Sequence, residues 1–550
     1  MSRTSRRLVL SCLCILVGYS IFGVYALSLR FHFYFPVEAY WLSFVLVSIP
    51  LVCEVAFWGD RGKLRLFYLL SFSLMIHLQY VVVDSSPFLS SYDAVADYRL
   101  TNKIVADSQW VPFESVGWGL GTEYRFYPIT DFIYATLSLI TGIPLLVVVK
   151  YLFVVKGLVV PPLVDRWFRG FFNHRVAYLA TVLFLASPGA ILYPHKECFA
   201  VIFFFVGLYA SSKIEKNRRY LLIGLISILT LVMTHHFTTY VFLVLLTSLF
   251  LASHFYKRRN AIRVSGQFFL LCWIIFAGWI AFIAWTTIAM HQKLFYEAFF
   301  GFVLPGQLTF SELLPLYSQY ERILVWLGTG IASVSAIVGF LSYIRHRKSF
   351  SSSFFAMMVF LIPLLAVATF FRFMPTTYGV LISHRAYEFG YIGVGAFSGL
   401  FFVSVFRSRK SSTSNGILIG AIIAVIIAGP IAGGMHPRTF AIVSDVISPE
   451  AFSLNAWISE STASNENTIV DKVVKLILTG YGDSTVVTDP EFFGSQNFSF
   501  PTNASYVVTY IYMTDFYGPN ATKFHNSPYL HIIYTNSILQ AYRISNSTSS

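Results

Sequence analysis

Two aspartates four residues apart, Asp93 and Asp97, open a stretch whose spacing predicts a helix, AVADYRLTNKIVADSQW. At positions i and i+4 the two carboxylates share one helical face, where like charges repel by about a few tenths of a kcal/mol. Such a pair can share a proton, raise one pKa or hold a divalent metal. The alternative is a solvated acidic helix start, which the helix dipole favours. We interpret Asp93 and Asp97 as catalytic candidates and the adjacent Tyr98 as a substrate-binding candidate.

Two polar turns between apolar segments supply further candidates for substrate binding. The first contains His195, Lys196 and Glu197, where the lysine could meet a lipid phosphate and the glutamate could add a carboxylate. A polar turn with a snorkelling lysine is the alternative. The second turn contains His235 and His236, which point apart if both are helical, so that one metal ion would not take both. Hydrogen bonding to a polar ligand and an ordinary interfacial turn are both open readings.

Arg372 and Arg385 are the last candidates, near the end of the apolar part of the chain. The guanidinium group matches the geometry of a phosphate, so either arginine could bind a phosphorylated lipid. Pairing with Glu388 or with a loop carboxylate is the alternative.

The segments that must position these groups are mostly apolar. The chain of 550 residues is 56% hydrophobic and only 12% charged, and its mean hydropathy is +0.66. A surface this apolar needs lipid to cover it. Apolar runs of bilayer-spanning length, roughly 20 residues, lie near 8–28, 39–57, 66–83, 144–164, 176–193, 198–212, 220–234, 238–255, 266–290, 322–344, 352–371, 388–406 and 416–434. We therefore predict about thirteen transmembrane helices.

The distribution of basic residues predicts the orientation. When the spans alternate from a cytoplasmic N-terminus, more than half of the 39 Lys and Arg residues fall in cytoplasmic segments, as the positive-inside rule requires. The net charge of +13 is thus a topology signal, and a nucleic-acid partner is not expected. The same parity places the C-terminus outside the cytoplasm, in agreement with Asn-X-Ser/Thr sequons in the tail.

This topology divides the chain into two predicted parts. Residues 1–435 form the membrane domain, with a long first outer loop at 84–128 and a short interfacial helix at 129–143. Residues 436–550 are less apolar and predict a small extracytoplasmic α/β domain. Within it we expect a helix at 471–478, strands at 484–489 and 505–513, and a hairpin at 530–544.

Residues 80–215 resemble the GT-C-type membrane glycosyltransferases, which use lipid-phosphate-linked sugars, and look most like archaeal members and uncharacterised relatives. The resemblance is carried by Asp93, Asp97 and Tyr98 in the first long outer loop and by the helix that ends NKIVADSQW. Tyr127-Pro128 then precedes a stretch ending ITGIP, and DRWFRGFFNHR leads into AYLATVLFLASPGAILYPHKE. No WWDYG-like motif is present, which disfavours an oligosaccharyltransferase role.

The resemblance implies a GT-C-like fold and a function. The first-loop acid, Asp93 or Asp97, would be the catalytic base or a metal ligand, and Arg385 or Arg372 would bind the carrier phosphate. A divalent metal is a possible cofactor. The expected partners are a polyprenyl- or dolichyl-phosphate-linked sugar and membrane lipid, with sugar transfer to an acceptor at the outer membrane face.

Two other classes of function remain open at this point. A transporter or lipid flippase needs polar residues buried in the middle of its spans, for which Glu54, Lys150 and Lys156 are the candidates. A non-catalytic membrane scaffold that displays the C-terminal domain is the other alternative.

Overall fold

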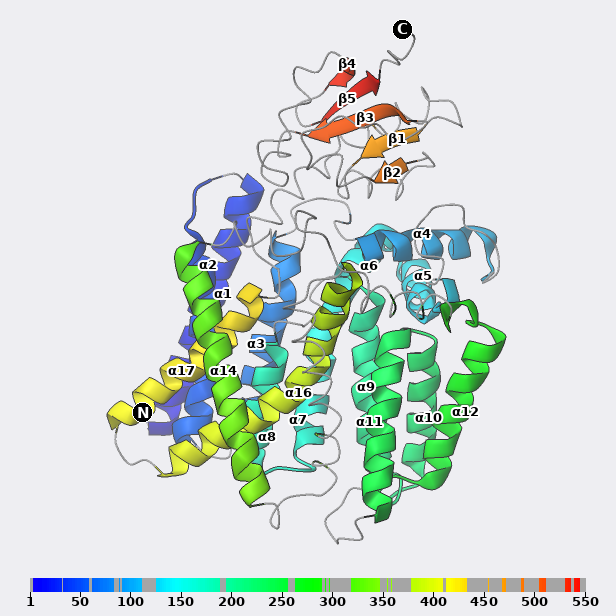
Figure 1. Ribbon diagram of the computed structural model, residues 1–550. Helices are drawn as coiled ribbons and strands as arrows, with labels where there is room; N and C mark the ends of the chain where they lie inside the picture. The colour runs from blue at the N-terminus through cyan, green and yellow to red at the C-terminus, as the bar shows by residue number, and fades with distance from the viewer. Residues whose placement is uncertain are drawn as a thin grey trace.

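The structure is a computed structural model, and it describes a defined part of the chain. The described residues are 3–31, 33–58, 62–83, 89, 92–110, 125–187, 194–255, 263–288, 292, 296, 318–346, 354, 358, 377–408, 412–432, 454, 467–470, 486–488, 504–510, 530–535 and 539–544. Helices dominate up to residue 432, and the described strands all follow it (Figure 1).

The α-helices follow the apolar runs of the sequence. They are α1 (Arg3–Phe31), α2 (Val37–Cys53), α3 (Gly62–Val83), α4 (Tyr92–Asp107), α5 (Ile129–Thr141), α6 (Leu145–Tyr151), α7 (Val155–Phe168), α8 (His174–Leu185), α9 (Lys196–Ser211), α10 (Arg219–Val232), α11 (His236–Phe255), α12 (Gly266–Phe282), α14 (Gln319–Arg345), α16 (Thr377–Ser408) and α17 (Ser412–Ala432). The π-helix η1 (Glu54–Trp58) extends α2, and the 3-10 turn η3 (Leu152–Val154) joins α6 to α7.

These helices identify a multi-pass membrane protein. Within the described residues, eight helices are long and apolar enough to cross a bilayer, and α8, α10 and α12 are shorter apolar helices. Every predicted span except 352–371 contains a helix, and that segment lies outside the described residues apart from Phe354 and Met358.

Two helices, α4 and α5, lie across one end of the bundle instead of running through it (Figure 1). The predicted interfacial helix at 129–143 corresponds to α5, which begins after Pro128 and ends at Gly142 with φ +70°. Glycine adopts this left-handed conformation at little cost, and Pro144 then prevents the helix from continuing. The chain can therefore turn from the bundle end into α6 within three residues.

Small residues allow the long helices to approach closely. A Cβ on Gly395 of α16 would lie 2.7 Å from the Ala180 carbonyl oxygen of α8, and one on Gly399 would lie 3.1 Å from the Ala180 nitrogen. This glycine pair at i and i+4 is the small-residue contact that lets helices pack backbone to backbone in lipid. It fixes α16 against α8 at the centre of the bundle.

The C-terminal region forms a five-stranded mixed sheet of order β2-β1-β3-β5-β4. Its strands are β1 (Asn467–Val470), β2 (Val486–Thr488), β3 (Ala504–Tyr510), β4 (Leu530–Thr535) and β5 (Leu539–Ile544). Strand β1 pairs in parallel with β2 and β3, whereas β5 pairs antiparallel with β3 and β4. The predicted strands and hairpin are confirmed, β1 was not predicted, and the helix expected at 471–478 lies outside the described residues.

Candidate functional site

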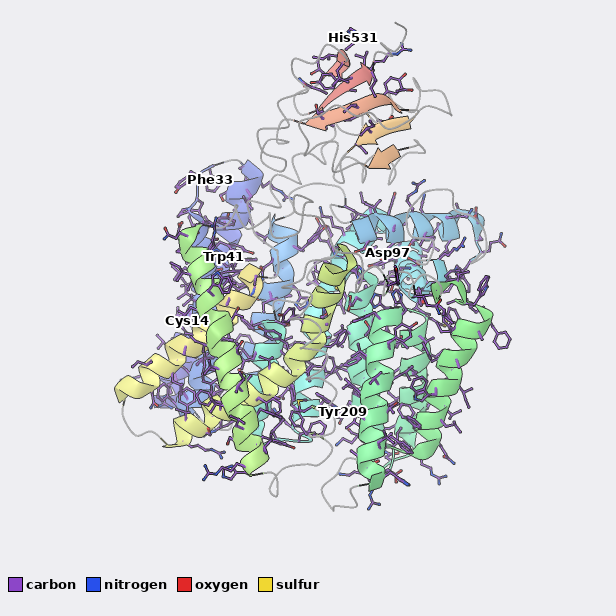
Figure 2. The ribbon with its side chains drawn as sticks, viewed as in Figure 1. Cys14, Phe33, Trp41, Asp97, Tyr209 and His531 are labelled. Carbon is purple, nitrogen blue, oxygen red and sulfur yellow. The ribbon has the colours of Figure 1, made fainter. Side chains whose placement is uncertain are left out.

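The site begins on one face of α4. Asp97 is fully buried, whereas the Asp93 side chain is 21% exposed. Other faces of α4 carry Ala94 and Val95, which pack in an apolar cluster with Val148 of α6. This packing turns the aspartates toward the end of the bundle. In Figure 2, the Asp97 side chain is on the lower side of α4, at the end of the bundle nearer the sheet.

A buried lysine joins α4 to α5 and α9. Lys196, the first residue of α9, donates from Nζ to Asp131 Oδ2 at 2.7 Å and to the Tyr127 carbonyl oxygen at 2.8 Å. Its Nζ lies 3.4 Å from Asp97 Oδ1. Thr101 adds a hydrogen bond of 3.3 Å to Asp131 Oδ1. One ammonium group is therefore held by two buried carboxylates and a carbonyl oxygen.

The electrostatics of this cluster favour a proton on one of its acids. Burial raises the pKa of Asp97 well above its usual range, and the Lys196 ammonium opposes that rise only in part. Asp131 and Asp93 raise the pKa of Asp97 further by repulsion. Burial also raises the pKa of Asp131, again against Lys196. A protonated Asp97 beside an ionised Asp131–Lys196 pair would leave no net charge buried, which is the least costly state.

His195 links α9 to the more exposed aspartate. It is the N-cap of α9, and its Nδ1 accepts a hydrogen bond from the Glu197 backbone N–H at 3.0 Å. With Nδ1 as acceptor, the neutral ring carries its proton on Nε2. That nitrogen lies 3.3 Å from Asp93 Oδ2. His195 is thus placed to orient the Asp93 carboxylate.

The second histidine turn meets the same region. Glu197 Oε2 lies 4.0 Å from His195 Nδ1 and 4.0 Å from His235 Nε2. The rings of His235 and His236 are stacked, with centroids 5.1 Å apart. The prediction that these neighbours point apart is wrong, because His235 lies in the turn before α11 and only His236 follows the helical spacing.

His195, Glu197 and His235 together form a group that suits a divalent metal. Each is buried, and one donor atom from each lies within 4.8 Å of the others. Two imidazoles and a carboxylate are donors that Zn²⁺ accepts. His235 Nδ1 lies 2.8 Å from the Thr238 hydroxyl and accepts the Thr238 backbone N–H at 3.4 Å, and these two contacts fix the orientation of the ring. The His195 nitrogen that faces Glu197 is Nδ1, which already accepts the Glu197 backbone N–H, so a metal bound there would displace that hydrogen bond.

Aromatic residues enclose the site on the side of α12. Trp110, which follows α4, stacks on Trp279 of α12 with ring centroids 6.1 Å apart and planes 5° apart. The indole of Trp110 donates to the Arg125 carbonyl oxygen at 2.8 Å. Tyr127 packs beside His236, with centroids 5.2 Å apart. These contacts tie α4 and the start of α5 to the bundle and shield the charged cluster.

The remaining predicted residues lie elsewhere or outside the described residues. Tyr98 packs against the apolar cluster between α4 and α6. Arg372 lies outside the described residues, and Arg385 lies in α16 but its side chain is not described. Asp131 was not predicted, although an acid in the first turn of an otherwise apolar helix is a usable signal.

Comparison with known proteins gives the fold a context. No protein-family model matches the sequence, and no curated protein matches it. The apo oligosaccharyltransferase of Archaeoglobus fulgidus has a TM-score of 0.53 at 14% identity, over 88% of this chain and 75% of that one. The oligosaccharyltransferase AglB of the same organism, in complex with an inhibitory peptide and a dolichol-phosphate, has a TM-score of 0.51 at 14% identity, over 89% and 75%.

A bacterial structure is also similar. ArnT from Cupriavidus metallidurans, bound to undecaprenyl phosphate, has a TM-score of 0.49 at 11% identity, over 88% of this chain and 99% of that one. The Archaeoglobus similarity extends over most of this chain. The membrane domain of this protein therefore has the fold of the GT-C-type membrane glycosyltransferases.

Proposed function

We propose that this protein is a membrane glycosyltransferase that transfers a sugar from a polyprenyl-phosphate donor to an acceptor hydroxyl at the outer membrane face. The observation that carries the proposal is the Asp93 carboxylate, partly exposed and oriented by His195, above a buried charged cluster at one end of the bundle. The GT-C-type fold and the dolichol-phosphate held by AglB support a lipid-phosphate donor.

The proposed reaction is a single displacement at the anomeric carbon of the sugar. Asp93 accepts the proton of the acceptor hydroxyl as its oxygen forms the new bond to that carbon, the role of a general base. The bond from that carbon to the phosphate oxygen breaks, and polyprenyl phosphate leaves with the electron pair. His195 orients Asp93, whereas Asp97 and Asp131 hold Lys196 and through it the start of α9.

Lys196 is better suited to this structural role than to contact with the donor. Its ammonium is buried and already meets three oxygen acceptors. The donor phosphate would then need another cation. A divalent metal held by His195, Glu197 and His235 would supply that charge and stabilise the leaving phosphate. Arg385 and Arg372 stay candidates for the same task.

We further propose that the N-terminus is cytoplasmic and that residues 436–550 share the outer face with the site. His531 of the sheet and Asp97 are on the same side of the bundle in Figure 2, while Tyr209 of α9 lies toward the opposite end. An impermeant maleimide should therefore label an Asp107→Cys variant in intact cells but not an Asn217→Cys variant. Labelling with the reverse pattern would refute the orientation.

The transporter alternative has less support in the described residues. Two of its candidate charges form separate ion pairs inside the bundle: Lys156 with Glu388 at 2.9 Å, and Glu54 with Arg65 at 3.4 Å. Paired buried charges hold helices together and do not by themselves mark a transport path.

Reconstitution tests the proposed activity. Purified protein in liposomes should transfer a labelled sugar from a polyprenyl-phosphate donor to an acceptor, and Asp93→Asn should lower kcat by about 10²–10⁴-fold, the usual contribution of a general base. Asp107→Asn is the matched control, since Asp107 ends the same helix in an exposed pair with Lys103. Full activity in the Asp93→Asn variant, or no transfer from any polyprenyl-phosphate donor by the wild type, would overturn the proposal.

A further inference from the structure

The connection between α9 and α10, residues 212–219, carries an excess of positive charge, and we call it the basic turn. It lies toward the end of the bundle opposite the site, since Figure 2 shows Tyr209 near the end of α9 and Asp97 at the other end of the bundle. The turn contains one acid, Glu215, and four cations: Lys213, Lys216, Arg218 and Arg219. None of these four forms an ion pair with another residue that the structure describes. Three positive charges are therefore uncompensated.

The backbone of the basic turn is fixed by hydrogen bonds. The Asn217 amide donates to the Lys213 carbonyl oxygen at 3.0 Å, and the Asn217 side-chain oxygen accepts from the Arg219 amide at 3.0 Å. Lys213 Nζ lies over the Tyr209 ring, 5.5 Å from its centroid, and Tyr220 meets that ring edge-on at 6.1 Å between centroids. Tyrosine is enriched at the headgroup level of membranes. The cations are therefore held in fixed positions at the depth of the lipid headgroups.

An exposed apolar strip on α10 continues from these cations. Leu222, Ile226 and Leu229 lie on one face of α10 and are 65%, 55% and 48% exposed. Arg218 and Arg219 precede Leu222 by four and three residues, so the same face carries positive charge at its beginning. A phospholipid has the matching shape, with a phosphate for the arginines and acyl chains for the strip. A soluble anion would contact the cations only.

The connection between α7 and α8, at the same end of the bundle, lacks this arrangement. Of its three arginines, Arg169 is already paired, with its Nη2 2.5 Å from Asp165 Oδ2. The other two are Arg166 and Arg175. Residues 176–185 of the following helix are all buried, so no exposed apolar strip continues from these arginines. A comparable number of cations thus occurs here without the features that suit a lipid.

We propose that the basic turn and the exposed face of α10 bind one anionic phospholipid, with its phosphate at Arg218 and Arg219 and its acyl chains along Leu222 and Ile226. The assignment to the cytoplasmic leaflet rests on the proposed orientation of the chain, whereas the binding itself does not. Helices α9 and α10 pack against each other, and α9 begins at Lys196 in the site. The lipid therefore fixes one end of a helix pair whose other end carries the charged cluster.

Hydrogen exchange in nanodiscs tests this site without any sugar transfer. Protein in phosphatidylcholine discs is compared with protein in discs that also contain phosphatidylglycerol. Peptides covering 211–222 should exchange about tenfold more slowly with phosphatidylglycerol, the factor expected for a site about 90% occupied. Peptides covering 166–175 should exchange equally in both discs. Equal exchange of the 211–222 peptides in the two kinds of disc would overturn the inference.

Charge variants locate the effect. Each Lys or Arg near an anionic lipid contributes about fivefold to affinity, so Arg218→Gln with Arg219→Gln should bind about 25-fold more weakly and lose nearly all of the protection. Arg218→Lys with Arg219→Lys retains both charges and should keep most of it. The matched control is Arg166→Gln with Arg175→Gln, which removes two charges from the α7–α8 connection and should behave like wild type. Wild-type protection in the Arg218/Arg219 glutamine variant, or an equal loss in the control, would show that no specific site exists.

A soluble headgroup separates a lipid from a free anion. Glycerophosphoglycerol, the headgroup of phosphatidylglycerol without acyl chains, should give no protection when it is added to phosphatidylcholine discs. Protection equal to that by phosphatidylglycerol would make the basic turn a site for soluble phosphate esters and refute the lipid. If the wild-type protein transfers no sugar, or if the cysteine labelling is reversed, the proposed function or orientation fails, and the exchange data still decide whether the lipid binds.

Discussion

Replacing Lys196 with methionine tests whether the charged cluster depends on one ammonium group. Methionine keeps much of the side-chain length but removes the contacts to Asp131, Asp97 and the Tyr127 carbonyl oxygen. Removing one partner of a buried ion pair costs about 3–5 kcal/mol, and the lost neutral hydrogen bond adds about 1 kcal/mol. We therefore expect a loss of about 4–6 kcal/mol in the free energy of unfolding near neutral pH.

The pH dependence of this loss identifies its cause. Without the ammonium, the pKa values of Asp97 and Asp131 should rise further, because burial already raises both against Lys196. Groups with raised folded-state pKa values stabilise the fold at low pH and lose that contribution as pH rises through the folded values. The defect of the Lys196→Met variant should therefore shrink toward pH 4–5, by up to about 1.4 kcal/mol per pH unit for each proton.

Denaturant unfolding in detergent, followed by tryptophan fluorescence, measures the difference. Lys103→Met is the matched control, since Lys103 forms an exposed pair with Asp107 on α4, with 37% and 39% of the side chains exposed. Exposed pairs contribute about 0–1 kcal/mol. A Lys196→Met protein that is as stable as the Lys103→Met control, or equally destabilised at every pH, would falsify the claim that the Lys196 ammonium stabilises the buried carboxylates.

Four further variants, one of them a control, probe three separate features. Because burial raises the pKa of Asp97, the wild-type protein should lose up to about 1.4 kcal/mol of stability per pH unit above pH 4. Asp97→Asn should abolish this loss, and urea melts across pH measure it. Gly339→Ala should cost about 1–3 kcal/mol, since its Cβ would collide with the Phe397 carbonyl, whereas Gly330→Ala meets nothing within 4 Å and should be neutral or stabilising in thermal melts. Asn173→Ala should cost about 1 kcal/mol by removing the N-cap of α8, and an unchanged melting temperature would contradict that role.

The spans were predictable from the sequence because lipid imposes a simple rule. A segment in the bilayer has to satisfy its own backbone hydrogen bonds, so a long apolar run has to be helical. The same reasoning found α5, where Gly142 and Pro144 end the helix. Strand β1 was missed because its four residues, Asn467–Val470, are too short to show an alternating pattern.

The site was only partly predictable because its contacts join distant segments. The spacing of Asp93 and Asp97 indicates a shared face, but nothing local shows that this face meets the start of α9. Lys196 and Asp131 are 65 positions apart, and their pairing depends on how the chain returns to the end of the bundle. The sequence of one polar turn suggested that Lys196 was available to bind a phosphate. In the folded chain, oxygen acceptors surround the Lys196 ammonium group.

The arrangement of charges explains why Asp93 is the better candidate for chemistry than Asp97. Asp97 is fully buried and lies beside Lys196, so its carboxyl group is committed to the contact between α4 and α9. Asp93, one turn earlier on the same face, has a fifth of its side chain exposed and lies beside an imidazole. A base needs access to its substrate and a neighbour that fixes its geometry. The two aspartates therefore have different roles: Asp97 anchors α4, and Asp93 is held where a hydroxyl can reach it.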